Sequence, residues 1–247
     1  RRYLAPQHIK YGEDRGIPKE EMEAERYRTE TDPEKIGRHL NWDGPADHLG
    51  PCLMMPDGQV RPDNPRIDKK GKPIKVEQPR GKPNGLSVPR GVQPLLSDPS
   101  QPLVITESGI KALAAYLAGF PSVGVNGAFG WRKNGKLIPD LAAIPCEGRE
   151  FLIAFDSDAA TNPKVLMAEK RLAESLRHRG ANVRIARIPS GPNGEKMGVD
   201  DYRVVYGSEG LGDVFRRTSA PNALPVMTAM QLVESPERIK YLIEDFV

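Results

Sequence analysis

The strongest constraint on the fold is a pattern of short apolar runs and helical periodicity that occupies the middle of the sequence. The helices are expected to end at Gly119 and Gly180, and Pro163 is a favoured first helical residue. In chain order, the expected elements are a strand at 103–106, a helix at 110–117, strands at 122–125 and 151–155, a helix at 163–179 and a strand at 182–188. This order predicts an α/β domain with a Rossmann-like, largely parallel sheet.

The flanking segments differ in composition from this unit. Residues 1–41 are charged, and a polar helix is expected over 19–28 after Pro18. Residues 42–99 carry frequent prolines and glycines between short extended pieces, such as 73–78 and 85–88. This is typical of a small irregular, β-rich subdomain without helices. After Phe215 the composition is that of a linker, and the last residues, 227–247, end without a stop signal. We therefore expect the chain to be a piece of a longer one.

Several classes of protein are disfavoured by composition. The hydrophobic fraction of 38% is adequate for a packed core, yet no apolar run approaches the roughly 20 residues that span a bilayer. The charged start of the chain lacks the apolar core of a signal peptide. Cys52 and Cys146 are far apart, and no second pair completes a zinc site. We expect a cytoplasmic protein with reduced thiols and no membrane partner.

Acidic residues follow three of the expected strands. Glu107 comes directly after the first strand, Asp156 and Asp158 after the third, and Asp200 with Asp201 after the fourth. Carboxyl ends of parallel strands share one edge of a sheet, where ligands bind. Clustered carboxylates repel one another unless a cation lies among them, and oxygen ligands suit Mg²⁺. An isolated Asp-x-Asp would be read as a turn or cap, and Glu107 as a first-turn glutamate. The matched positions favour a magnesium site, with Mn²⁺ as the alternative ion.

Positive charge is concentrated before the α/β unit. The net charge is only +3, but residues 58–90 contain nine Lys and Arg against Asp63, Asp68 and Glu77. Such a stretch can bind a polyanion, although a solvated basic loop is the alternative. Single aromatic residues in Gly-rich loops, such as Phe129 and Trp131, are expected to be packing residues rather than platforms for bases.

Four segments together resemble the TOPRIM domain of primases, topoisomerases and recombination nucleases. They are VITESGIKA at 104–112, VGVNG at 123–127, IAFDSD at 153–158 and GVDDY at 198–202. The resemblance is strongest to primase-like TOPRIM proteins of plasmids, phages and integrated elements. It covers about 103–206 well and 49–99 more loosely, through RPDNP at 61–65 and EQPRG at 77–81. One position departs from the family pattern, because Ser108 stands where Gly usually follows the glutamate, and Gly109 comes one place later.

This resemblance implies a role for each matching residue. Glu107 would act in general acid/base catalysis or join in metal binding. Asp156, Asp158, Asp200 and the adjacent Asp201 would hold metal. In bacterial primases a basic subdomain before TOPRIM handles template and nucleotides. The residues expected to bind nucleic acid or nucleotide are Arg61, Arg66, Lys75, Arg80, Lys82 and Lys111. The implied domains are an N-terminal basic primase-type subdomain at 1–100, a TOPRIM catalytic domain at 101–213, and at 214–247 a linker leading to an ATPase or helicase domain.

The function that the resemblance implies is a magnesium-dependent DNA primase of a mobile genetic element. Its partners would be a single-stranded DNA template, nucleoside triphosphates, and a helicase or ATPase domain in the same or a partner chain. One alternative is a TOPRIM nuclease that cuts phosphodiesters. Another is a catalytically inactive nucleic-acid-binding module, for which Ser108 is the only hint. A topoisomerase is disfavoured because no attached domain clearly supplies a nucleophilic tyrosine.

Overall fold

The computed structural model describes residues 3–218 of the chain. The expected lead-in to an ATPase domain at 227–247, and most of the expected linker, lie outside the described residues. None of the helices in the described part combines the length and the apolar character that crossing a membrane requires.

A four-stranded, all-parallel sheet forms the centre of the α/β part, in the order β5-β4-β8-β9. In its central pairings, Ile105 lies opposite Val123 on one side and Ile153 on the other. The parallel sheet expected from the sequence is confirmed. Its strands are β4 (Leu103–Thr106), β5 (Ser122–Gly124), β8 (Glu150–Ile153) and β9 (Asn182–Ile185).

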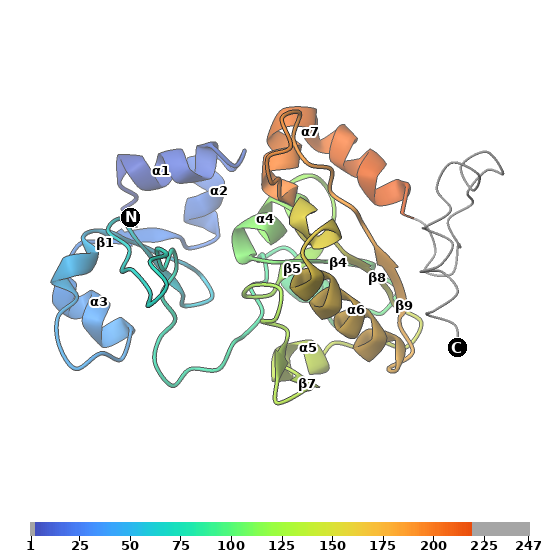
Figure 1. Ribbon diagram of the computed structural model, residues 1–247, viewed down its shortest axis with the longest axis horizontal. Coiled ribbons are helices and arrows are strands. Elements are labelled where there is room, and N and C mark those ends of the chain that lie inside the picture. Colours follow the sequence, from blue (N-terminus) through green and yellow to red (C-terminus); the bar gives the residue numbers. More distant parts are fainter. Residues whose placement is uncertain (1–2, 219–247) are drawn as a thin grey trace.

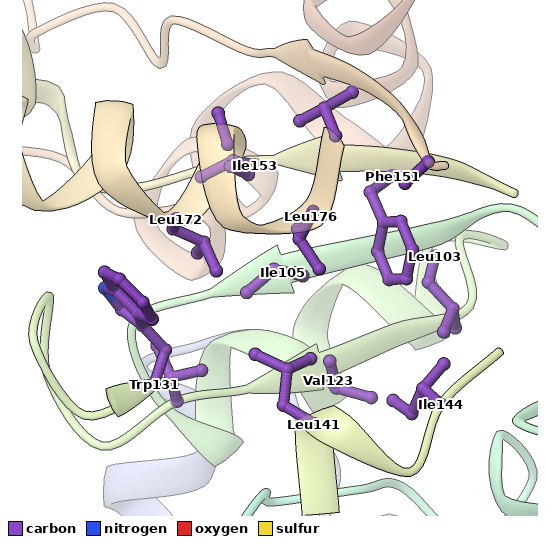
Figure 2. Close-up of a cluster of buried hydrophobic side chains, with 14 of the residues drawn as sticks. Leu103, Ile105, Val123, Trp131, Leu141, Ile144, Phe151, Ile153, Leu172 and Leu176 are labelled. Atoms are coloured by element: carbon purple, nitrogen blue, oxygen red, sulfur yellow. The ribbon is translucent and has the colours of Figure 1, made fainter. Parts of the chain in front are cut away.

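Both faces of this sheet are covered, because successive side chains of a strand point to opposite sides. Leu103 and Ile105 pack on one face with Leu172 and Leu176, as Figure 2 shows. Val104 packs on the other face with residues of the helices that cover it. The first face is covered by α5 (Pro139–Ala142) and α6 (Pro163–Arg177), and the second by α4 (Gly109–Leu117) and α7 (Val199–Arg216).

Local signals account for the boundaries of two of these helices. The Asn162 side chain caps α6 by accepting the backbone N–H of Lys164 at 3.1 Å, and Pro163 is the first helical residue. Beyond the ends of α4 and α6, Gly119 and Gly180 adopt positive φ angles of 92° and 83°. These features agree with the expectations from the sequence. The long helix α7 was not expected; it is interrupted at Gly207, where φ is 72°.

Residues 3–84 form a second, mixed part, most of which is seen left of α4 in Figure 1. The chain then crosses to the α/β part, where Leu86, Val92 and Leu96 pack in the main core. The helix after Pro18 ends at Ala24 rather than Arg28, because Arg26 takes a left-handed φ of 73°. The extended pieces expected at 73–78 and 85–88 make only isolated bridges, through Pro73, Glu77 and Ser87. Its elements are α1 (Pro6–Glu13), α2 (Lys19–Ala24), β1 (Arg28–Glu30), α3 (Pro33–His39), the 3₁₀ turn η1 (Asp47–Leu49), β2 (Cys52–Met54) and β3 (Val60–Pro62). A second 3₁₀ turn, η2 (Gln93–Leu95), lies in the segment that leads into β4.

The two parts share a hydrophobic cluster across α4. Met22 and Leu53 from the N-terminal part, both fully buried, belong to the same cluster as Ile110 and Leu113 of α4. The strand-like segment around Ser87 also pairs with Gly124, at the end of β5, through two backbone hydrogen bonds of 2.9 and 2.8 Å. The N-terminal part is therefore packed directly onto the helix that follows Glu107.

Cys52 and Cys146 are buried free thiols, as expected. Burial, with the nearby charges of Asp63 and Glu77, raises the pKa of Cys52 to about 12. This thiol therefore stays protonated at neutral pH and serves as a small apolar core residue.

Candidate metal centre

The acidic residues lie at the point where the sheet connections change direction. From β4 the chain passes through α4 to β5, whereas from β8 it passes through α6 to β9, on the other side of the sheet. The carboxyl ends of β4 and β8 are therefore adjacent, with their following helices on opposite faces. In open α/β sheets a ligand site is expected at such a switch point. Glu107 comes directly after β4, and Asp156 follows β8 after two residues.

The structure brings Glu107, Asp156 and Asp158 together. Each offers a carboxylate oxygen, and these oxygens lie within 4.8 Å of one another. The backbone N–H of Asp156 also donates to Oε1 of Glu107 at 3.3 Å. Asp158 belongs to η3 (Ser157–Ala160), a 3₁₀ turn that bends the chain after β8. This bend lets residues two apart face one site, as we expected from the sequence.

Asp200 borders this group but belongs to a helix rather than to a strand end. It lies in the first turn of α7 and is only 2% exposed. Gly198 shows how close the groups are, because a Cβ there would lie 2.6 Å from Asp200, 2.7 Å from Lys111 and 3.0 Å from Asp156. Only glycine can occupy this position without displacing the side chains around it.

Asp201 has a different role in the structure. Its Oδ2 accepts the backbone N–H of Gly198 at 2.9 Å, which caps the start of α7. The structure does not include it in the group of three carboxylates that could hold an ion. The assignment of Asp201 as a metal ligand stays a prediction, and the contact that the structure shows for its carboxylate is this capping hydrogen bond.

Two lysines contact the acidic group. Lys111, from the first turns of α4, pairs with Asp156. The Lys196 ammonium lies 3.0 Å from Oδ2 of Asp156 and 2.9 Å from Oδ1 of Asp158. Lys111 was expected to contact nucleotide, and without a nucleotide the structure shows it paired with an acidic residue of the centre. Lys196 was not expected at all, because its only signal in the sequence is that it precedes the Gly198–Asp201 segment.

The pKa shifts of these groups show how the site balances its charge. Burial, followed by the negative charge of Asp156, raises the pKa of Glu107. Burial is also the main reason that the pKa of Asp200 is raised. Burial alone would lower the pKa of Lys196, but its hydrogen bonds to Asp158 and Asp156 and the acidic charges outweigh that effect and raise it. The centre therefore favours positive charge among its carboxylates.

The residues present fit a hard divalent cation. All candidate ligand atoms are carboxylate oxygens, which Mg²⁺, Mn²⁺ and Ca²⁺ prefer. Within residues 3–218, three buried side-chain oxygens accept no hydrogen bond, and two of them belong to this site: Oδ1 of Asp158 and Oδ1 of Asp200. The ammonium of Lys196 is near the first of them, but not in hydrogen-bonding geometry. A buried acceptor without a donor is unfavourable, and a bound cation would satisfy both.

Because Lys196 holds a position among the carboxylates, it should compete with a metal ion. A partly exposed ion pair contributes up to about 1 kcal/mol, and Lys196 makes two. Lys196→Met is therefore expected to tighten Mn²⁺ binding by roughly tenfold. Electron paramagnetic resonance of free Mn²⁺ measures the change. Lys164→Met, on the exposed face of α6, is the control, and equal affinities in the two variants would contradict the competition.

The conformation of the turn after Glu107 explains why Ser108 can stand where the TOPRIM pattern usually has glycine. Ser108 is extended, with φ −158° and ψ 161°, so this position does not require glycine. Gly109 does require it, since a Cβ there would lie 2.1 Å from Oγ of Ser87. Gly124 lies against the same turn, and a Cβ there would approach the backbone carbon of Ser108 to 2.4 Å. The turn is therefore close-packed on both sides, with glycine at 109 instead of 108.

The basic residues of the N-terminal part fall into two groups. Arg66 donates to both carboxylate oxygens of the buried Glu77, at 2.8 and 2.7 Å, and Arg80 pairs with Asp43 at 3.2 Å. Within residues 3–218, Lys75 and Lys82 are exposed and make no ion pair. Arg66 therefore holds the fold together, while the two lysines are free to meet a polyanion.

Arg61 is connected to the acidic centre through a stack of side chains that the sequence did not reveal. Its guanidinium lies 4.6 Å from the Tyr11 ring centroid, and that of Arg15 lies 3.9 Å from the same centroid. Nε of Arg15 in turn lies 3.4 Å from Oδ2 of Asp200. Arg15 is thus a site residue that sequence reasoning missed, brought in by the loop between α1 and α2.

Comparison with known families gives a match to a domain family whose function is unknown. The model of a domain of unknown function, DUF3854, matches residues 92–210, which include every acidic residue of the centre. No curated protein matches the sequence.

Solved structures with the same fold are bacterial primase domains. The zinc-binding and RNA polymerase domains of the Aquifex aeolicus primase match with a TM-score of 0.54 and 14% identity over 98% of this chain; the chain spans 62% of that structure's length. The RNA polymerase domain of Mycobacterium tuberculosis primase DnaG, in complex with double-stranded DNA, matches with a TM-score of 0.56 and 16% identity, over 97% of this chain and 85% of that one. At these identities the likeness establishes the fold.

Proposed function

We propose that this chain is the catalytic core of a magnesium-dependent DNA primase built on a TOPRIM domain. The observation that carries the proposal is the group of Glu107, Asp156 and Asp158 at the switch point of a parallel sheet. The fold shared with primase RNA polymerase domains supports it. So does the exposed basic segment that precedes the α/β part. In this proposal residues 1–100 form the basic subdomain and 101–213 the catalytic domain.

In this proposal Asp156 and Asp158 hold Mg²⁺, or Mn²⁺ in its place, and Asp200 serves a second ion. The bound metal would act as a Lewis acid and neutralise charge on the triphosphate. In the reaction the primer 3′-oxygen forms a bond to the α-phosphorus of the nucleotide, and the bond from that phosphorus to the bridging oxygen breaks, releasing diphosphate. Glu107, whose pKa is raised by burial, is suited to take the proton of the 3′-hydroxyl.

The chain's lysines and arginines would bind the substrates. When no metal is bound, Lys111 and Lys196 balance the negative charge of the carboxylates. Once the centre holds metal, both lysines would be in place to contact the triphosphate oxygens. Arg61, Lys75, Arg80 and Lys82 would contact the phosphates of single-stranded DNA, while Arg66 positions the segment through Glu77. Such contacts are salt-sensitive and largely independent of sequence.

The resemblance to element-borne TOPRIM proteins supports a role in the replication of a plasmid, phage or integrated element. It also supports a helicase or ATPase domain as the partner, in the same chain or another. Both extend the primase proposal and depend on it.

Primer synthesis on single-stranded DNA, with labelled nucleotides and Mg²⁺, tests the function. We expect short oligonucleotides whose formation is lost when Asp156 and Asp158 are both replaced by alanine. Normal synthesis by that double variant would refute the proposal. Cutting of the template that depends on the same aspartates, without synthesis, would assign a nuclease instead. Template binding without either reaction would identify an inactive binding module.

A further inference from the structure

A basic β-hairpin extends from the α/β part between β5 and β8. It consists of β6 (Arg132–Lys133) and β7 (Lys136–Leu137), joined by a tight turn in which Asn134 and Gly135 have φ angles of 52° and 77°. Lys133 and Lys136 are exposed, and within the described residues neither they nor Arg132 make an ion pair. The hairpin thus presents three positive charges that nothing in this part of the chain neutralises.

An aromatic ring lies at the base of this hairpin. Phe129 is 38% exposed, and the Arg132 guanidinium lies 5.1 Å from its ring centroid. The neighbouring Trp131 is 1% exposed and packs in the main core with Leu141 and Leu172, as Figure 2 shows. Its carbonyl accepts the N–H of Ile138 at 2.9 Å, which closes the base of the hairpin. An exposed ring and a cation are therefore held on a rigid base.

The hairpin is connected to the acidic centre on one side. The loop that leads to it starts beside Glu107, whose carbonyl accepts the N–H of Gly127 at 2.9 Å. On its other side, α5 begins just after the hairpin, and Oδ2 of Asp140 accepts the N–H of Leu86 at 3.0 Å. Leu86 belongs to the segment that carries Lys82. The hairpin therefore connects the catalytic edge with the basic segment of the N-terminal part.

We propose that this hairpin binds single-stranded nucleic acid, with a base stacked on Phe129 and phosphates on Arg132, Lys133 and Lys136. Stacking on an aromatic ring combined with a basic track is how sequence-independent single-strand binding works. The inference deepens the primase proposal and rests on it, since it names the surface that guides the strand near the acidic centre. It also replaces the expectation that Phe129 is only a packing residue.

Binding of a fluorescent oligothymidylate across a range of salt concentrations, followed by anisotropy with the full chain, tests this surface. The variant is Lys133→Gln with Lys136→Gln. Each phosphate contact contributes about 0.7 to the logarithmic salt slope for single strands, so the slope should fall by about 1.4. The control, Lys164→Gln with Lys170→Gln, removes the same charge from exposed, unpaired positions on α6 and should keep the wild-type slope. Phe129→Leu should weaken binding by roughly tenfold with an unchanged slope.

Four outcomes would overturn the inference or separate it from the function. Equal slopes for the hairpin variant and the α6 control would assign the effect to general charge and refute the hairpin site. Wild-type affinity in Phe129→Leu would refute the stacking. If the hairpin variant loses binding but still extends a pre-annealed primer at saturating concentration, the hairpin and the catalytic centre are both supported. If the wild-type chain binds no single strand, the hairpin proposal and template binding fail together.

Discussion

Asp156→Asn is expected to reduce magnesium-dependent primer synthesis by roughly 10²- to 10³-fold, the usual effect of removing one strong electrostatic group from an active site. Asp156 has the most contacts of the centre, because Lys111 and Lys196 pair with its two carboxylate oxygens and its N–H donates to Glu107. The amide has nearly the same shape, so the effect isolates the charge. Steady-state incorporation of labelled nucleotide and Mn²⁺ titration measure it.

The matched control is Asp213→Asn, which neutralises a carboxylate of α7 that pairs with Arg216 on the surface at 2.6 Å. This variant should keep wild-type synthesis and metal affinity. Wild-type synthesis by Asp156→Asn would contradict the assignment of the metal centre. Lost synthesis with unchanged Mn²⁺ affinity would show that Asp156 acts by holding Lys111 rather than by binding metal.

Arg149→Ala is expected to lower the free energy of unfolding by about 3–4 kcal/mol, because three backbone carbonyls lose their charge-assisted hydrogen bonds. Arg149 is fully buried, and its guanidinium donates to the carbonyls of Gln101 at 2.9 Å, Leu96 at 2.7 Å and Leu95 at 2.8 Å. These bonds fasten the segment that enters β4. Urea unfolding followed by circular dichroism measures the change.

Arg177→Ala provides the comparison for this prediction. Arg177 makes one such hydrogen bond, to the carbonyl of Val183 at 3.0 Å, and is only partly buried. We expect it to cost about 1 kcal/mol. Similar losses in the two variants would mean that the carbonyls of residues 95–101 find other donors when Arg149 is absent.

The elements that could be predicted from the sequence are those with local signals. The run at 103–105 is apolar because both faces of β4 are buried, and α6 has Asn162, Pro163 and Gly180 at its ends. Helix α1 shows the opposite case. Its buried residues are His8 and Gly12, which no apolar periodicity would indicate. His8 is buried by contacts distant in sequence, with Thr29 at 2.6 Å and Asp63 at 3.0 Å.

The residues of the candidate centre also fall into those that local sequence signals predict and those that they do not. Glu107, Asp156 and Asp158 could be predicted because strand ends determine their positions. Arg15 and Lys196 could not, because a loop of the N-terminal part and the loop before α7 bring them to the carboxylates. The pairing of Arg66 with Glu77 was also hidden, since it joins residues on separate turns of an irregular segment. Side-chain chemistry alone could not tell an arginine that is free from one that is already bound.

The cluster shared across α4 limits how freely the α/β unit can be moved between proteins. Met22 and Leu53 cover Ile110 and Leu113, on the helix that follows Glu107 and carries Lys111. A fragment cut at residue 101 would expose that apolar face to water and make it a site of self-association. Recombination or gene fusion that exchanges the α/β unit must therefore carry the preceding hundred residues with it. We therefore expect the two parts to be exchanged together.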